Sequence, residues 1–408
     1  MKNTIALFAL LAIVSVSFAD PADPQVTTFN VIQDSSRVVR ISYTLDEPAY
    51  VTMDILTNHV SIGGQNIQNV IGDVNKLVSA GDHTIAWYAR RSWPDQRFDD
   101  PIVSVQLTAS AADNPPDIMD IDLETKVVSY YASIDFLPDG ALANDKYRTS
   151  HLVMKKVHAA GKTFTMGSPT DENPNRLASE VQHPVSFTKD YYLAIYEMTR
   201  KQFALLGCTV AATYGAQDTP YDGDDPDQTP IGRILYNNLR GSVDDGIDWP
   251  TTGSTVGGYL ATMRSATGLA LDLPTEAQWE FACRAGTTTA MYNGKPNAGT
   301  WGNSDCNDIA WYTGTSEQKP HAVGGKQPND WGFYDMYGNV REWCLDWYAT
   351  YGSTLAVDPQ GPSSGTERVI RSSYYWDGSR GMRSAYRTSQ YPRTADTTYG
   401  FRLCLPLQ

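Results

Sequence analysis

The chain has 408 residues, of which 41% are hydrophobic and 19% charged, and its formal net charge at pH 7 is −14. This length predicts two or three domains with enough chain for a sizeable core. Because binding to phosphates needs clustered lysine and arginine, an acidic chain without a basic run argues against a nucleic-acid partner and favours neutral or cationic ones.

The N-terminus has the pattern of an export signal. Lys2 precedes an apolar run from Ile5 to Val16, and Ser17-Phe18-Ala19 offers small residues at the positions that a signal peptidase reads. We therefore expect residues 1–19 to be a signal peptide that is cleaved after Ala19, and the mature protein to be secreted or periplasmic. No later stretch reaches the eighteen apolar residues of a membrane span, so the protein is not expected to be membrane-spanning.

Residues 20–112 show the two-residue period of half-buried strands. Val39, Ile41, Tyr43 and Leu45 alternate with Arg40, Ser42 and Thr44, and similar runs follow between turn-forming clusters. The pattern predicts an all-β sandwich. The stretch GDHTIAWYAR, which starts at Gly81, resembles the immunoglobulin-like modules of secreted bacterial proteins. Residues 113–150, which open with Asp113-Asn114-Pro115-Pro116, are expected to be a connector.

Residues 151–408 mix short helices with many loops. Thr199 with Gln202, and Thr275 with Gln278, have the spacing of capping boxes, so each pair predicts the start of a short helix. The acidic stretch from Asp218 to Pro230 resembles a calcium loop, but it lacks the glutamate spacing of an EF-hand. A solvated surface insertion is the favoured interpretation.

The five cysteines permit up to two disulfides in an exported chain, and their spacing does not fix the pairing. The six histidines are scattered without paired spacing, which is typical of structural residues rather than of metal ligands.

Five ordered blocks resemble the formylglycine-generating enzyme family, also called sulfatase-modifying factors. They are KTFTMGS, YYLAIYEMTRKQF, LPTEAQWEFACRAGT, PNDWGFYDMYGNVREWCLDWY and YGFRL, and the likeness covers about Ser150 to Gln408. The resemblance implies an α+β fold that is a variant of the C-type lectin architecture, often stabilised by calcium. It also implies a chemistry: active members oxidise a cysteine of a client sulfatase to formylglycine with molecular oxygen and a copper(I) ion held by two thiolates.

The position of that thiolate pair is occupied by other residues here. In the family the pair follows a Gly-Gly-Ser turn, and the corresponding stretch RSSYYWDGSRGMRSAYR, from Arg371 to Arg387, has no cysteine. The first thiol falls at about Asp377 and the second among residues 379–382, while Ser372 and Ser373 replace the paired glycines. Arg341 also replaces the usual aromatic residue. Because copper(I) requires soft ligands, copper is not expected and no catalytic residue is assigned.

The resemblance places a structural calcium ion at Asp335, Gly338, Val340 and Glu342. The chemistry of these residues agrees, because carboxylates and the carbonyls of a tight turn are hard oxygen ligands. The alternative is that the two carboxylates cap turns and pair with arginines.

In the family architecture, the run that starts at Tyr374 would line the client groove. Aromatic rings with arginine and aspartate suit the recognition of a peptide, protein or glycan, although such residues also occur as plain packing. The candidate groove residues are Tyr374, Tyr375, Trp376, Asp377, Arg380, Arg383, Tyr386 and Arg387.

The sequence therefore predicts a secreted, calcium-stabilised binding module that has lost catalysis. One alternative is a formylglycine-generating or related oxidase that acts on sulfatase cysteines through a non-standard centre. Another is a structural surface protein that acts mainly through its N-terminal sandwich.

Overall fold

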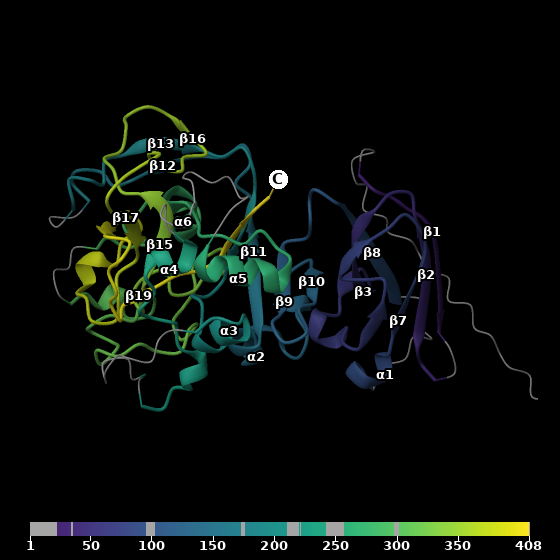
Figure 1. Cartoon of the computed structure of the whole chain (residues 1–408). Coiled ribbons are helices and arrows are strands. Elements are labelled where there is room, and N and C mark those ends of the chain that lie inside the picture. Colours follow the sequence, from purple (N-terminus) through teal and green to yellow (C-terminus); the bar gives the residue numbers. More distant parts are fainter. Residues whose placement is uncertain are drawn as a thin grey trace, which may run out of the picture. The chain divides into compact units, whose positions relative to one another are not determined.

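The computed structural model describes residues 23–33, 36–94, 103–172, 176–209, 220, 222–241, 257–297 and 302–407. The expected signal peptide and its cleavage site lie outside the described residues. The chain forms two compact units (Figure 1): unit 1 comprises Met1–Asp120 and Val128–Tyr147, and unit 2 comprises Ile121–Val127 and Arg148–Gln408. Over the described ranges, no helix has the length and apolar character needed to cross a membrane.

Unit 1 contains two antiparallel sheets that share one hydrophobic core. In β2 (Val39–Leu45) the alternate residues Val39, Ile41, Tyr43 and Leu45 are buried, which confirms the alternation predicted for this strand. The immunoglobulin-like identity of the unit stays a prediction.

One sheet of unit 1 has the order β1 (Val26–Gln33), β2 (Val39–Leu45), β7 (Gly81–Trp87) and β5 (Val70–Gly72). The other has the order β4 (Val60–Ser61), β3 (Ala49–Thr57) and β6 (Lys76–Val78), with β8 (Val103–Ala111) also paired to β3. Short helical segments are η1 (Gly64–Asn66) and α1 (Ala89–Ser92).

The stretch expected to be a connector carries regular structure. Residues 121–127 belong to unit 2, whereas residues 128–147 belong to unit 1. The elements of this stretch are β9 (Ile118–Asp122), β10 (Val128–Tyr131), η2 (Ile134–Phe136), η3 (Ala141–Ala143) and α2 (Lys146–Thr149).

Unit 2 is built from small sheets that join distant parts of the chain. The C-terminal strand β20 (Cys404–Pro406) pairs with β14 (Tyr191–Ala194), which pairs with β11 (His151–Val157). A second sheet has the order β12 (Thr163–Met166), β13 (His183–Ser186) and β16 (Ala356–Val357). A third has the order β18 (Arg387–Gln390), β17 (Arg368–Arg371), β15 (Arg341–Trp347) and β19 (Tyr399–Gly400).

Two helices of unit 2 begin where the capping signals predict. The Thr199 hydroxyl accepts a hydrogen bond from the backbone N–H of Gln202, and the Gln202 side chain accepts one from the Thr199 N–H. Thr275 and Gln278 form the same reciprocal pair. Both predicted capping boxes are confirmed. The helices are α3 (Arg200–Leu205), α4 (Tyr236–Arg240), α5 (Gly258–Thr267) and α6 (Glu276–Arg284), with short 3-10 segments η5 (Pro226–Gln228), η7 (Ser304–Cys306) and η8 (Ser379–Gly381).

The acidic stretch from Asp218 to Pro230 lies partly outside the described residues. In its described part Asp222, Asp225 and Asp227 are exposed, as a surface insertion requires. Asp225 caps η5 by accepting a hydrogen bond from the Asp227 N–H.

Candidate functional site

Hydrogen bonds join the turn that follows β17 to the turn at residues 338–339. Ser372 has a φ of +65°, a left-handed conformation that favours glycine, at a position where the resembling family has one. Its hydroxyl donates to the Gly338 carbonyl at 3.4 Å, and the Tyr375 N–H donates to the Asn339 carbonyl at 2.9 Å. The serine therefore adopts a backbone conformation that glycine favours, and its side chain adds a hydrogen bond to the turn.

Asp377, at about the place where the resemblance puts the family's first thiol, is held by its neighbours. Its Oδ2 accepts a hydrogen bond from the Ser373 hydroxyl at 2.8 Å and lies 3.4 Å from an Arg341 guanidinium nitrogen. The same guanidinium lies over the ring of Tyr374, 4.1 Å from its centroid. The thiolate position is thus filled by an ion pair of hard oxygen and guanidinium groups, neither of which binds copper(I) well.

The candidate groove residues divide into a surface set and a buried set. Tyr374, Trp376, Arg380 and Tyr386 reach solvent, and Trp376 is 50% exposed. The other four, Tyr375, Asp377, Arg383 and Arg387, are buried.

The two buried arginines are already paired with carboxylates. Arg383 donates to both oxygens of Glu180, at 2.6 and 2.8 Å, and Arg387 donates to both oxygens of Glu276, at 2.7 Å each. These arginines therefore stabilise the core, and the surface that could meet a ligand narrows to Tyr374, Trp376, Arg380 and Tyr386.

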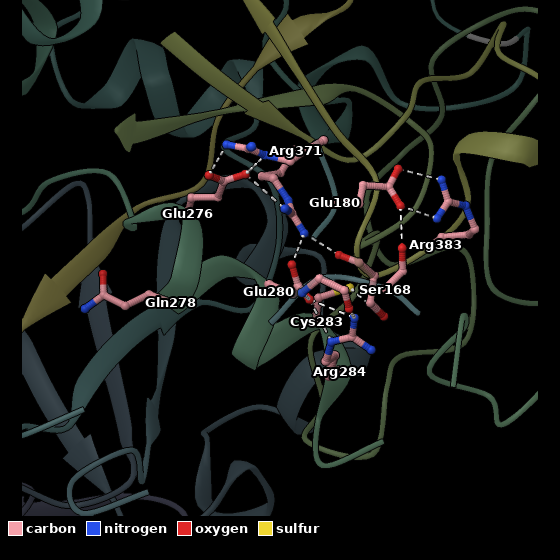
Figure 2. A network of polar contacts seen from close by, with 12 residues as sticks. Ser168, Glu180, Glu276, Gln278, Glu280, Cys283, Arg284, Arg371 and Arg383 are labelled. Carbon is pink, nitrogen blue, oxygen red and sulfur yellow. Dashed lines mark hydrogen bonds and ion pairs between the residues drawn. The ribbon is translucent and has the colours of Figure 1, made fainter. Parts of the chain in front are cut away.

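Helix α6 supplies the acidic half of a buried charge network (Figure 2). Arg371 bridges Glu276, at 3.1 Å, and Glu280, at 2.8 Å, while Arg284 pairs with Glu280 at 2.7 Å. Burial alone would raise the pKa of Glu276, but Arg387 and Arg371 hold it below its usual value. The network joins α6 to β17 and β18, so it fixes the base of the turn that carries Asp377.

The four residues proposed to bind calcium are buried, and Glu342 acts electrostatically on Asp335. Asp335 Oδ2 accepts a hydrogen bond from the Gly324 N–H at 2.7 Å, and its Oδ1 has no hydrogen-bond partner among the residues that the structure describes. Glu342 is engaged differently. Both of its oxygens accept hydrogen bonds from Arg402 at 2.7 Å, and one also accepts from Trp279 Nε1.

A third carboxylate, Glu197, completes this cluster, and the sequence analysis missed it. Glu197 accepts hydrogen bonds from the Val340 N–H at 3.0 Å and from the Asn339 side chain at 2.8 Å. Burial, Asp335 and Glu342 together raise the pKa of Glu197 well above its usual value. Burial also raises the pKa of Asp335 to about 6. Three acids thus lie around Arg402, with Arg148 also acting on Asp335, and the burial that raises two of their pKa values favours bound protons or a cation.

The donor set matches calcium only in part. Asp335 offers an open oxygen, whereas Arg402 already occupies the carboxylate of Glu342. Across the described ranges, no group of three or more histidine, cysteine, aspartate or glutamate side chains is arranged to hold a metal ion. Calcium at Asp335, Gly338, Val340 and Glu342 therefore stays a prediction.

The five cysteines are buried and carry free thiols in this structure. Burial raises the pKa of Cys283 and of Cys306 to about 12, and that of Cys208 to about 11. A thiol must lose its proton to bind copper(I), so these groups are poor ligands as they stand.

One family model and several known proteins match this part of the chain. The family model of the sulfatase-modifying factor enzyme 1-like domain matches residues 144–406. Formylglycine-generating enzyme from Thermomonospora curvata is 34% identical over 285 residues, which cover 60% of this chain and 91% of that protein. Serine/threonine-protein kinase pkn1 from Chlamydia caviae is 29% identical over 266 residues, which cover 63% of this chain but only 39% of that protein.

Two solved structures are similar to this chain at lower sequence identity. Treponema denticola variable protein 1 has 24% sequence identity and a TM-score of 0.49, with 62% of this chain and 95% of that chain covered. PvdO from Pseudomonas aeruginosa has 23% identity and a TM-score of 0.48, with 63% and 95% covered. Since the family model spans well over half of the sequence, the chain belongs to the sulfatase-modifying factor family.

Proposed function

We propose that the domain at residues 144–406 is a non-catalytic binding module, which holds a peptide segment of a partner protein without oxidising it. The ion pair of Asp377 and Arg341 in place of a thiolate is the observation that carries this proposal. No cysteine occurs in the sequence between Cys344 and Cys404, so this turn has no thiol to offer. The family reaction by the family mechanism requires two.

The surface set around Trp376 suits a peptide. Tryptophan, tyrosine and arginine are the residue types that contribute most to protein interfaces, because they bury large apolar planes and still form hydrogen bonds. Trp376 presents a half-exposed indole. Tyr374 is held beneath Arg341, so its ring loses little freedom when a ligand packs on it.

We further propose that the protein is exported and that its mature chain begins at Asp20. The support is the sequence pattern of residues 1–19. Mass spectrometry of the protein recovered from the producing cell measures the first residue directly. A chain that still begins at Met1 would contradict export by cleavage.

A peptide that carries a sulfatase-type cysteine motif tests both halves of the proposed function. The full chain is mixed with the labelled peptide, copper(I) and oxygen; aldehyde formation is followed by mass shift and binding by fluorescence anisotropy. We expect binding without an aldehyde product. Trp376→Ala should weaken binding at least about tenfold, as loss of a central interface anchor does. Tyr391→Ala is the matched control, because Tyr391 is also a large exposed aromatic, at 56%, but is outside the surface set.

Each result decides between the candidate functions. A copper-dependent aldehyde would show that another centre replaces the missing thiols and that the oxidase alternative is right. If the peptide binds neither the wild type nor the Trp376 variant, or if both aromatic substitutions weaken binding equally, the peptide-binding proposal is wrong.

A further inference from the structure

A cavity of about 360 Å³ opens in unit 2 beside the end of β15. Its volume lies within the roughly 300–1,000 Å³ of small-molecule sites. Of the eight candidate groove residues only Arg387 lines it, so it is a different site from the surface around Trp376. Its walls come from residues 346–362, from Glu276 at the start of α6, and from Met166 and His183 on β12 and β13.

The loop that forms most of the wall is fixed to the domain. Its strand β16 pairs with β13, with Ala356 opposite Val185, and Asp358 accepts two hydrogen bonds from Thr188. Gly361, with a φ of +75°, approaches so closely that a Cβ added there would lie 2.9 Å from the Cβ of Asp346. Because these contacts are made within the free chain, the cavity exists before any ligand binds.

Two aromatic residues line the cavity with their rings held in place. The ring of Tyr351 lies 4.4 Å from that of His183 and 3.9 Å from the guanidinium carbon of Arg387. The guanidinium carbon of Arg368 lies 3.4 Å from the centroid of the Trp347 ring. The buried Nε1 of Trp347 has no hydrogen-bond acceptor within the part of the chain that the structure describes. The Tyr351 hydroxyl is likewise buried without a partner among the described residues, so each ring brings an apolar surface and an unsatisfied polar atom to the cavity wall.

The charged groups at the base of the cavity are balanced. Glu276 is bound by Arg387 through two hydrogen bonds of 2.7 Å. Asp346 accepts a hydrogen bond from the Glu276 N–H at 2.7 Å, and burial together with Glu276 raises its pKa to about 8. Asp346 is thus largely neutral at pH 7. A charged ligand would find no free counter-charge on these groups, and a purely apolar ligand would leave polar atoms without partners.

We propose that this cavity binds a neutral sugar unit, which stacks on Tyr351 or Trp347 and hydrogen-bonds through its hydroxyls to Asp346 and Gln360. A sugar ring combines an apolar C–H face with a ring of uncharged donors and acceptors, and the cavity offers the counterpart of both. The site stands apart from the peptide surface, so it does not depend on the function proposed for that surface.

The experiment titrates the full chain with the methyl glycosides of glucose, galactose, mannose and N-acetylglucosamine and measures binding by calorimetry. At least one of them should bind at millimolar concentration or below. Thr350→Trp places a large side chain at the exposed rim of the cavity and should weaken binding at least tenfold. Ser353→Trp is the matched control, since Ser353 is exposed on the same loop but does not line the cavity. Gln360→Ala removes one proposed hydrogen-bond partner of the sugar and should weaken binding roughly threefold to tenfold.

Three results would overturn the proposal. The first is that none of the four glycosides binds a wild-type chain that shows a normal thermal transition. The second is that Thr350→Trp and Ser353→Trp reduce affinity equally, which would place the sugar elsewhere. The third is that glucosamine or glucuronate binds more tightly than the neutral glycosides, which would show that the cavity selects a charged ligand.

Discussion

Replacing Arg383 with alanine should strongly destabilise unit 2. Arg383 and Glu180 are both fully buried, and two hydrogen bonds of 2.6 and 2.8 Å join them (Figure 2). Glu180 also accepts a hydrogen bond from the Ser168 hydroxyl at 2.8 Å. A carboxylate accepts such a hydrogen bond more strongly when it is ionised. Without the guanidinium, Glu180 must either keep an uncompensated buried charge or take up a proton.

The size of the effect follows from this burial. Removing one partner of a buried ion pair costs about 3–5 kcal/mol, because the remaining charge cannot reach water. Glu172, 3.0 Å from Arg383, also loses its partner, but burial already raises its pKa, so it can take up a proton and adds less to the cost. At roughly 2–4 °C per kcal/mol for a domain of this size, the melting temperature should fall by roughly 6–20 °C.

Thermal unfolding followed by circular dichroism measures this shift. Arg380→Ala is the control, because Arg380 lies on η8 three residues away and is exposed; it should change the free energy of unfolding by at most about 0.5 kcal/mol. Replacing both partners, as Glu180→Leu with Arg383→Met, should recover most of the loss, since neither member of the fully buried pair is then left without the other. If Arg383→Ala melted within about 2 °C of the control, the pair would not stabilise the fold as argued.

Three further changes probe other parts of the domain. If calcium binds at Asp335, chelation should lower the melting temperature by several degrees, and Asp335→Asn should remove that difference; identical melting with and without chelator would count against the ion. The folded chain holds a proton on Asp346 up to a pKa of about 8, whereas the unfolded chain releases it near about pH 4. The free energy of unfolding should therefore decrease as pH rises between these values, and Asp346→Asn should flatten that slope in a pH series of denaturant titrations. Thr275→Ala removes the N-cap of α6 and should cost about 1 kcal/mol in the same titrations, with exposed Thr366→Ala as the control.

Local signals in the sequence predicted local structure correctly. A capping box depends on residues three positions apart, so Thr199 with Gln202 and Thr275 with Gln278 identify their helices without any knowledge of the fold. The alternation of Val39–Leu45 likewise depends only on the geometry of a strand. The pairing of β20 with β14 could not be read in this way, because it joins two ends of the domain through short strands with no periodicity of their own.

The division of the candidate groove into surface and core is also a long-range property. Tyrosines and arginines in residues 374–387 have the same composition whether they face solvent or the interior. Glu180 precedes Arg383 by 203 residues, and Glu276 precedes Arg387 by 111. The sequence around Arg383 and Arg387 has no local pattern that predicts these partners. Glu197 was missed for the same reason: its hydrogen bonds to residues 339 and 340 span more than a hundred positions.

Two departures from the family motif become a single feature in the structure. Asp377 replaces a thiol and Arg341 replaces an aromatic residue, at positions 36 residues apart, and their side chains lie 3.4 Å apart. Both are more than half buried, so either charge alone would lose hydration without gaining a partner. The Arg341 guanidinium also covers the ring of Tyr374. The Asp377 carboxylate and the Arg341 guanidinium therefore stabilise each other's buried charge. Restoring a single cysteine at position 377 would leave the Arg341 guanidinium without this carboxylate, and it would not rebuild a copper site, which needs two thiolates.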